Sequence, residues 1–160
     1  RIGNNIPIKG FNIAALSNFL NDKVLNHFFI ATVTGIVPYV SMIRDYLHNG
    51  EDENFKFFVD HGASYTDEFV YDSELRSYVE KYPEIIQYFP TISRPNESKN
   101  QGWVGMKGRV NDFTEAMIND LNFKNDDTVV YACGHPGMIE DVKEKLNLQN
   151  FKVIEERFWK

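Results

Sequence analysis

Short, continuous apolar runs alternate with segments of helical periodicity along most of the chain, and this rhythm constrains the fold more than any other feature. The runs are aromatic or β-branched, as expected of strands buried on both faces. Five strands are predicted, over residues 27–31, 55–59, 86–92, 128–133 and 151–158. Helices are predicted over residues 36–47, 67–82, 111–121 and 136–146. The pattern predicts an α/β fold: a doubly wound, mostly parallel five-stranded sheet flanked by helices, in a Rossmann-like, three-layer α/β/α arrangement.

Residues 1–25 do not follow this rhythm, since Pro7, Gly10 and asparagine-rich stretches interrupt it. We interpret them as a connector or the end of a preceding domain, and residues 26–160 as one domain of ordinary size. Within that domain, residues 93–108 are polar and glycine-rich. A loop of that length usually has a function.

The composition excludes several classes of protein. The 160 residues carry a formal net charge of −6, whereas chains that follow phosphate backbones are usually basic, so we expect no nucleic-acid partner. No run approaches the roughly 20 apolar residues of a membrane span and no signal-peptide pattern is found, so the expected location is cytoplasmic. The single cysteine, Cys133, excludes an internal disulfide or a cysteine-based metal cluster. The spacing of His27, His48 and His61 predicts no metal site.

The strand-to-helix turns are the candidate binding positions, because ligands of doubly wound sheets lie outside the carboxyl ends of the strands. The first turn holds Thr32, Thr34 and Gly35 directly before a predicted helix. Free amides at that helix start, helped by its dipole, could hold a pyrophosphate, with hydrogen bonds from the threonine hydroxyls. Many such turns use threonine and glycine only for their geometry, so both interpretations stay open.

The fourth turn, Cys133-Gly134-His135-Pro136-Gly137-Met138, ends an apolar strand and starts a helix. A cysteine in this place is most often a small buried hydrophobic residue, and His135 could be a solvent-facing cap. The residues of this turn alone therefore assign neither side chain a chemical role.

Six segments in a fixed order carry a more specific signal. They are ATVTGIVPY at 31–39, HG at 61–62 followed by DEF at 67–69, SRP at 93–95, GRV at 108–110, CGHPGM at 133–138 and EERFW at 155–159. Together they resemble the nicotinamide-nucleotide-binding domain of the ferredoxin–NADP reductase superfamily, which is the C-terminal half of those enzymes. By the same resemblance, residues 1–25 would include the end of a flavin-binding domain.

The resemblance implies an oxidoreductase of the ferredoxin–NAD(P) reductase type. The domain would position NAD(P)H for hydride transfer to FAD, with electrons passing on to ferredoxin, flavodoxin or an iron–sulfur partner. The Arg-x-Tyr-Ser/Thr flavin motif of the family is absent from the chain, so FAD would be bound mainly by a domain that the chain does not contain. The alternative is a non-catalytic nucleotide-binding subunit of a larger NADH-dependent electron-transfer or monooxygenase reductase assembly. A flavodoxin-like or receiver domain would show the same alternation of strands and helices. This chain, however, lacks an acidic cluster and a Ser/Thr-rich flavin phosphate loop at the end of the first strand.

The resemblance also implies roles for individual residues. Cys133 would pack beside the nicotinamide as an orienting group, and Glu156 would help to position that ring or relay protons. Ser93 and Arg94 would grip the 2′-phosphate of NADP, with Arg109 as a second arm, which favours NADP over NAD. Trp159 would cover the flavin ring. The remaining nucleotide-binding candidates are Thr32, Thr34, Gly35, Gly62, Gly134, Pro136 and Met138.

One residue departs from the family pattern. The family usually has glycine where this chain has Val33. Glycine allows the backbone to approach a pyrophosphate closely, and a β-branched residue narrows that approach. The affinity for the nucleotide is the property that this departure affects.

Overall fold

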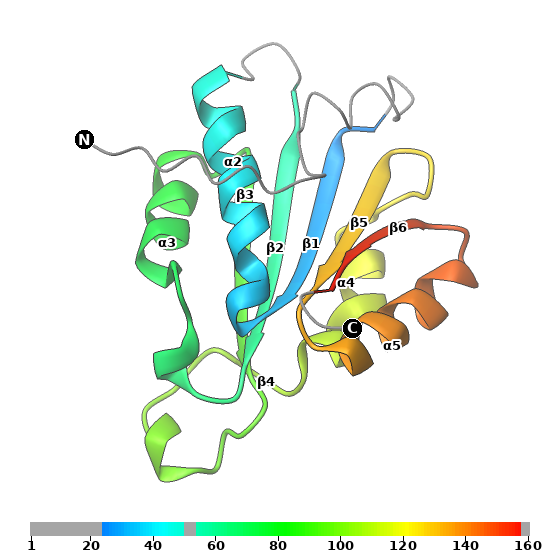
Figure 1. Ribbon diagram of the computed structural model, residues 1–160. Helices are drawn as coiled ribbons and strands as arrows, with labels where there is room; N and C mark the ends of the chain where they lie inside the picture. Colours follow the sequence, from blue (N-terminus) through cyan, green and yellow to red (C-terminus); the bar gives the residue numbers. More distant parts are fainter. Residues whose placement is uncertain (1–23, 50–53, 158–160) are drawn as a thin grey trace.

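The computed structural model describes residues 24–49 and 54–157, which form a parallel sheet between two layers of helices (Figure 1). The sheet has six strands in the order β4-β3-β2-β1-β5-β6, and every neighbouring pair is parallel. The strands are β1 (Asn26–Thr32), β2 (Lys56–Ala63), β3 (Ile86–Ile92), β4 (Met106–Lys107), β5 (Thr128–Cys133) and β6 (Lys152–Glu156). The predicted fold class is confirmed.

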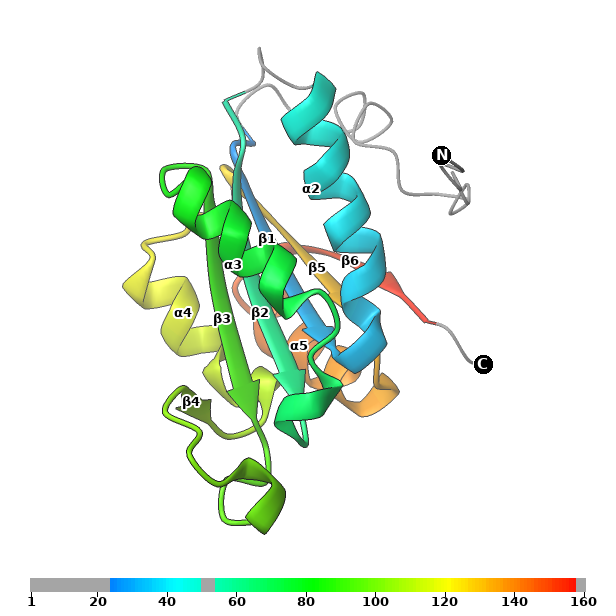
Figure 2. The ribbon, with the colours of Figure 1, turned by 90° about the vertical axis from the view of Figure 1, so that its left-hand side faces the viewer.

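Helices cover both faces of the sheet, as Figure 2 shows. They are α2 (Val37–Asn49) and α3 (Asp72–Lys81) on one face, and α4 (Thr114–Asp120) and α5 (Pro136–Asn147) on the other. Short 3₁₀ turns precede three of them, at Val33–Ile36, Thr66–Glu68 and Val110–Phe113. None of the described helices is long and apolar enough to cross a membrane.

Three details of the sequence prediction are corrected. The sheet has six strands rather than five, because residues 93–108, expected to be loop only, contain the two-residue strand β4. The second helix starts at Asp72 and not at residue 67, since Tyr71 takes a left-handed φ of 63° that breaks the helical path. The last strand covers residues 152–156 and not 151–158.

The strands β1, β2 and β5 are buried over nearly their whole length because helices pack on both faces of the sheet. Alternate side chains of β1 point to opposite layers: Phe29 packs under α2, and Phe28 packs on the α4 and α5 side. Phe29 stacks on Tyr39 of α2 with ring centroids 4.4 Å apart and an interplanar angle of 3°. These aromatic contacts fix the height of α2 over the sheet and therefore the position of the turn that precedes it.

The β3 edge of the sheet is short and interrupted. β4 pairs only with Thr91 and Ile92, the last two residues of β3. Pro90, directly before them, has no backbone N–H to offer a further strand.

The order in which strands are added to the sheet reverses at β1, so the carboxyl ends of β1 and β5 lie side by side. From β1 the chain continues to β2 and β3 on one side, and β5 then pairs with the opposite side of β1. The connections after β1 and β5 leave toward opposite faces, through α2 and α5 respectively. A crevice opens at such a switch point in α/β sheets.

The turns after β1 and β5 touch each other through two glycines. A Cβ on Gly35 would lie 2.3 Å from the backbone oxygen of Cys133, and a Cβ on Gly134 would lie 2.1 Å from the Thr32 hydroxyl oxygen. The same hydroxyl accepts a hydrogen bond from the backbone N–H of His135, at 2.8 Å. Both positions therefore need glycine so that the two turns can pack backbone to backbone.

We predict that Gly134→Ala lowers the free energy of unfolding by about 3 kcal/mol, because it combines a steric overlap with a φ of +129°. Gly102→Ala is the matched control, since Gly102 has a φ of +88° but no atom within 4 Å of an added Cβ. The control should lose only about 1 kcal/mol in urea denaturation. Equal losses in the two variants would show that the contact with Thr32 contributes nothing.

A buried histidine stands at the opposite end of the sheet. His27 starts β1, and its Nδ1 lies 2.8 Å from the hydroxyl of Tyr131 among the rings of Phe55 and Phe57. Burial lowers the pKa of His27 from 6.5 to about 4. The folded protein therefore holds this imidazole in its neutral form.

This shift predicts acid sensitivity between pH 6.5 and 4. In that window the unfolded chain binds a proton at His27 that the folded protein does not, so stability is complete above pH 6.5 and falls toward pH 4. The slope should be about 1.4 kcal/mol per pH unit for this residue. His27→Phe should remove that slope in denaturant titrations across the window, whereas replacing the exposed His48 by Gln should not. An unchanged slope in the Phe variant would contradict a neutral buried His27.

Candidate functional site

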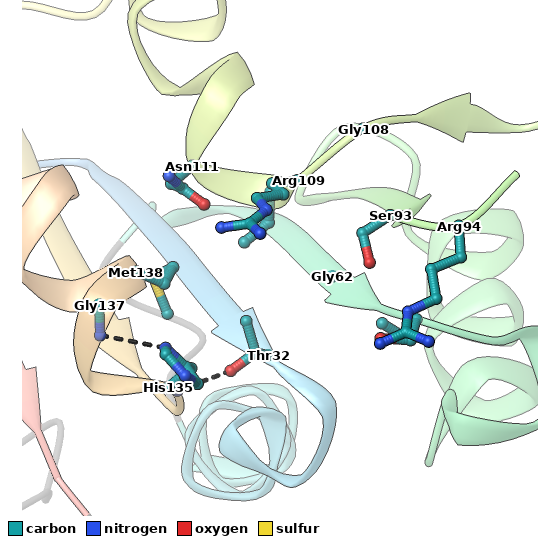
Figure 3. Close-up of a pocket in the computed structure, with 13 residues that line it drawn as sticks. Thr32, Gly62, Ser93, Arg94, Gly108, Arg109, Asn111, His135, Gly137 and Met138 are labelled. Carbon is teal, nitrogen blue, oxygen red and sulfur yellow. Dashed lines mark hydrogen bonds between the residues drawn. The ribbon is translucent and has the colours of Figure 1, made fainter.

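A cavity of about 520 Å³ lies in the crevice at the carboxyl ends of the strands (Figure 3). Its walls come from the ends of β1, β2 and β3, from the segment that leads into α4, and from the start of α5. Six of the residues singled out by the sequence line it: Thr32, Gly62, Ser93, Arg94, Arg109 and Met138. Six others do not: Thr34, Gly35, Cys133, Gly134, Pro136 and Glu156. Trp159 lies outside the described residues.

The turn after β1 contributes one polar side chain, Thr32, to this cavity. The Thr32 oxygen already accepts from His135 N–H, so its own proton is what the hydroxyl can still donate to a ligand. Gly35 is buried against Cys133, and its role is close packing rather than lining the cavity.

Val33 takes a left-handed conformation, with φ at 46°. This is the backbone region that glycine adopts freely and that costs a side-chain-bearing residue about 1–2 kcal/mol. The family's usual glycine at this position is therefore explained by the shape of the turn. Val33 keeps that shape at an energetic cost.

The start of α5 forms the opposite wall. His135 is its N-cap: the ring Nδ1 accepts a hydrogen bond from Gly137 N–H at 3.1 Å, and Pro136 occupies the first helical position. The amides of the first turn and the helix dipole present partial positive charge to the cavity. The expected solvent-facing cap at His135 is thus a helix cap beside the crevice.

The segment after β3 carries a cluster of charged and aromatic side chains. Arg94 Nη1 donates to the Tyr65 hydroxyl at 3.0 Å and pairs with Glu97 at 3.3 Å, and its guanidinium lies over the Tyr65 ring. The Tyr65 hydroxyl in turn donates to Glu97 at 2.7 Å. The hydrogen bond from Tyr65 is the main cause that holds the pKa of Glu97 below its usual value, and the contacts with Arg94 add to it. Arg94 therefore faces both the cavity and a carboxylate of the chain itself.

Asn100 fixes this cluster to the sheet and was not anticipated from the sequence. It is buried within the long loop, and its amide donates to the carbonyls of Ser64 and Arg94, at 2.8 Å each. Its side-chain oxygen accepts from Thr66 N–H at 3.0 Å. A buried loop asparagine that uses donor and acceptor together has no sequence signature, because its partners are backbone groups 6 to 36 residues away.

Arg109 enters the cavity from the segment between β4 and α4. Figure 3 shows its guanidinium directed into the space between the Thr32 and Ser93 walls, with Arg94 beyond Ser93 at the far end. Gly108 before it has a φ of +144°, and its carbonyl accepts from the Thr91 hydroxyl at 3.1 Å. Val110 after it packs on Gly62, where a Cβ would lie 2.7 Å away.

Cys133 and Glu156 lie together beside the cavity rather than in its wall. They are register partners at the ends of β5 and β6. The thiol is fully buried, and burial, with a smaller effect of Glu156, raises the pKa of Cys133 to about 12. Burial likewise raises the pKa of Glu156, whose Oε2 has no hydrogen-bond partner among the residues that the structure describes. The cysteine is therefore a protonated thiol and not a nucleophile.

His61, to which the sequence assigned no role, is hydrogen-bonded to the turn after β1. It is fully buried in β2, and its Nε2 lies 2.8 Å from the carbonyl oxygen of Val33. Its Nδ1 lies 3.2 Å from the hydroxyl of Tyr88. A histidine-glycine pair at a strand end gives no hint of a partner 28 residues earlier.

Comparison with known proteins agrees with this geometry. The model of the oxidoreductase NAD-binding domain matches residues 29–144. The chain is 27% identical over 141 residues to the embryo isozyme of chloroplastic ferredoxin–NADP reductase from Oryza sativa, covering 86% of this chain and 35% of the relative. It is 31% identical over 123 residues to the ferredoxin–NADP reductase of Thermosynechococcus vestitus, covering 73% of this chain and 31% of the relative.

A solved structure gives the same result. The ferredoxin–NADP⁺ reductase of Plasmodium falciparum with 2′P-AMP superposes with a TM-score of 0.64 at 26% identity, covering 92% of this chain and 55% of that structure. The chain spans about a third of the length of the two curated relatives. The resemblance to the ferredoxin–NADP reductase superfamily is confirmed, and the chain belongs to the oxidoreductase NAD-binding domain family.

Proposed function

We propose that this chain is the nucleotide-holding domain of a ferredoxin–NADP reductase-type flavoprotein, and that it positions NADPH for hydride transfer to FAD. The observation that carries the proposal is the cavity at the switch point, with two arginines in its walls and the Cys133–Glu156 pair beside it. The arrangement suits an elongated, polyanionic ligand with one neutral ring. A dinucleotide has this shape and charge.

The adenosine end of the ligand would lie at Ser93 and Arg94. A guanidinium binds a phosphate in a forked, charge-assisted way, and the serine hydroxyl adds a donor. The similar reductase from Plasmodium falciparum was solved with 2′P-AMP, a ligand that ends in this phosphate. Glu97 competes for Arg94, so binding of the 2′-phosphate requires that Arg94 turn from Glu97 to the ligand.

The diphosphate would lie between the two ends of the cavity. Arg109 projects into that space, and the α5 start contributes amides and the positive end of a dipole. Thr32 offers one hydroxyl proton. In this arrangement Arg109 and the start of α5 would neutralise most of the phosphate charge. The turn after β1, where Val33 stands in place of the family's glycine, would contribute less.

The nicotinamide would lie against Cys133 and Glu156. The Cys133 thiol is buried and uncharged, and the Oε2 of Glu156 is buried without a partner among the described residues, so both would contact the ring only after the segments that cover them move. When bound, the reduced nicotinamide supplies a hydride to the flavin. The task of the protein is to hold the ring in the orientation that this transfer needs.

We propose ferredoxin or flavodoxin as the electron acceptor; ferredoxin is the acceptor in the names of the two similar reductases. The second candidate is a non-catalytic nucleotide-binding subunit of an NADH-dependent assembly. The strained Val33 favours it, because a turn held at an energetic cost binds pyrophosphate less well than a glycine turn.

Titration calorimetry with NADP⁺, NAD⁺ and 2′-phospho-AMP separates the two candidates. We expect preference for the 2′-phosphorylated ligands, and Arg94→Ala should weaken NADP⁺ binding about tenfold to a hundredfold with little effect on NAD⁺. Glu97→Gln should strengthen NADP⁺ binding severalfold because it removes the competing carboxylate. Arg44→Ala, on the outer side of α2, is the control and should change neither affinity. Preference for NAD⁺ over both 2′-phosphorylated ligands would support the second candidate, and absence of binding by all three ligands would contradict both.

The purified chain should carry no stoichiometric flavin, because we propose that FAD is bound mainly by another domain. The measurement is the absorbance spectrum near the flavin bands after FAD is added and unbound FAD removed by gel filtration. A flavin spectrum at one equivalent per chain would contradict this part of the proposal.

A further inference from the structure

The turn after β1 is held by a contact that the known motifs of the chain do not include. Val33 stands at a φ of 46°, although a β-branched residue is among the least suited to that region. A backbone conformation of this kind persists only where the surrounding structure over-determines it. The contact that does so is the hydrogen bond between His61 Nε2 and the Val33 carbonyl, at 2.8 Å.

The direction of this hydrogen bond follows from the partners of the ring. A carbonyl oxygen can only accept, so Nε2 carries the proton. Burial lowers the pKa of His61 to about 4, which leaves the ring neutral near pH 7 and makes Nδ1 an acceptor. The Tyr88 hydroxyl, 3.2 Å away, donates to it. The Val33 carbonyl, which can only accept, thus requires the tautomer with the proton on Nε2, and the Tyr88 contact is compatible with it.

The ring is also fixed by its apolar and charged neighbours. Phe69 packs its ring against His61 with centroids 5.1 Å apart, and Trp103 of the long loop stacks on Phe69 at 5.5 Å. The carboxylate of Asp72 at the start of α3 raises the pKa of His61, but less than burial lowers it. The imidazole has little freedom to turn away from Val33 in this setting.

The fixed carbonyl determines where the neighbouring amide points. The described peptide bonds are all trans, so the Val33 C=O and the Thr34 N–H of the same peptide plane point in opposite directions. A carbonyl directed at His61 therefore sends the Thr34 N–H away from His61. Rotation of this peptide would reverse the Thr34 amide in the turn that directly follows Thr32, whose hydroxyl lines the cavity.

We propose that His61 is a positioning residue of the nucleotide site, which holds the Val33 peptide so that the turn after β1 is ready to receive the diphosphate. The inference rests on the proposed function, since it concerns the same ligand. It adds a residue that contacts no ligand and acts through the backbone of its partner. It also accounts for the presence of Val33. The hydrogen bond from His61 stabilises the left-handed conformation that glycine would adopt without help.

The test compares His61→Phe, which keeps a ring but removes the donor, with His61→Gln, whose amide can still donate to Val33. NADP⁺ affinity of the full chain is measured by calorimetry, and melting temperature is recorded for each variant. His61→Phe should weaken NADP⁺ binding about tenfold, as expected when the competent turn becomes a minority state, and His61→Gln should stay within about threefold of wild type. His27→Phe is the matched control: it alters a buried histidine at the other end of β1 and should lower stability without altering affinity.

The same substitution in a Val33→Gly background isolates the turn. Glycine adopts the left-handed conformation without help, so His61→Phe should then weaken NADP⁺ binding less than about threefold. Equal weakening in the two backgrounds, or equal weakening by His61→Phe and His61→Gln, would overturn the proposal.

A measurement without ligand distinguishes failure of this inference from failure of the proposed function. The ¹³C carbonyl resonance of Val33 and the amide resonance of Thr34 should shift in His61→Phe and stay near wild type in His61→Gln. If the wild type binds no nucleotide but these resonances respond as stated, the proposed function is wrong and the role of His61 in holding the Val33 peptide is supported. If the resonances do not respond, His61 does not hold this peptide, whatever the wild type binds.

Discussion

The packing of two turns against each other, one after β1 and one after β5, is the constraint on which the remaining structure depends. Gly35 lies against the carbonyl of Cys133, and Gly134 lies against Thr32. Larger residues would push the two turns apart, and with them the ends of β1 and β5 and the starts of α2 and α5. Because the connections leave toward opposite faces from this contact, the crevice is a geometric result of the topology. One wall of the site is therefore built from two turns that are packed directly against each other.

Burial disfavours charge on the polar groups around the crevice. His61 and Cys133 are removed from water, which disfavours their charged forms, and burial raises the pKa of the half-buried Glu156 as well. The charges that could hold a polyanion, Arg94 and Arg109, are instead on exposed segments. The molecule thus separates positioning groups, which are buried and uncharged, from binding groups, which are exposed and cationic.

The sequence was sufficient to predict the sheet, the layers and the turns, because continuous apolar runs and helical periodicity are local properties. It was also sufficient to place Thr32, Ser93 and Arg94 at one edge of the sheet, since parallel strands bring their carboxyl ends together, whereas Arg109 was assigned through the family resemblance. It did not predict β4, whose two residues carry no period. It also missed the contact of His61 with Val33 and those of Asn100 with its loop, because each depends on backbone groups that only the folded chain brings within reach.

The short edge of the sheet has a consequence for association between molecules. An exposed parallel strand presents unpaired N–H and C=O groups that can pair with a strand of another molecule. Here β4 covers only the last two residues of β3, and Pro90 removes a donor from the stretch before them. The long loop that leaves this edge can therefore carry the candidate binding residues Arg94 and Arg109 while the β3 edge remains a poor template for pairing with another molecule.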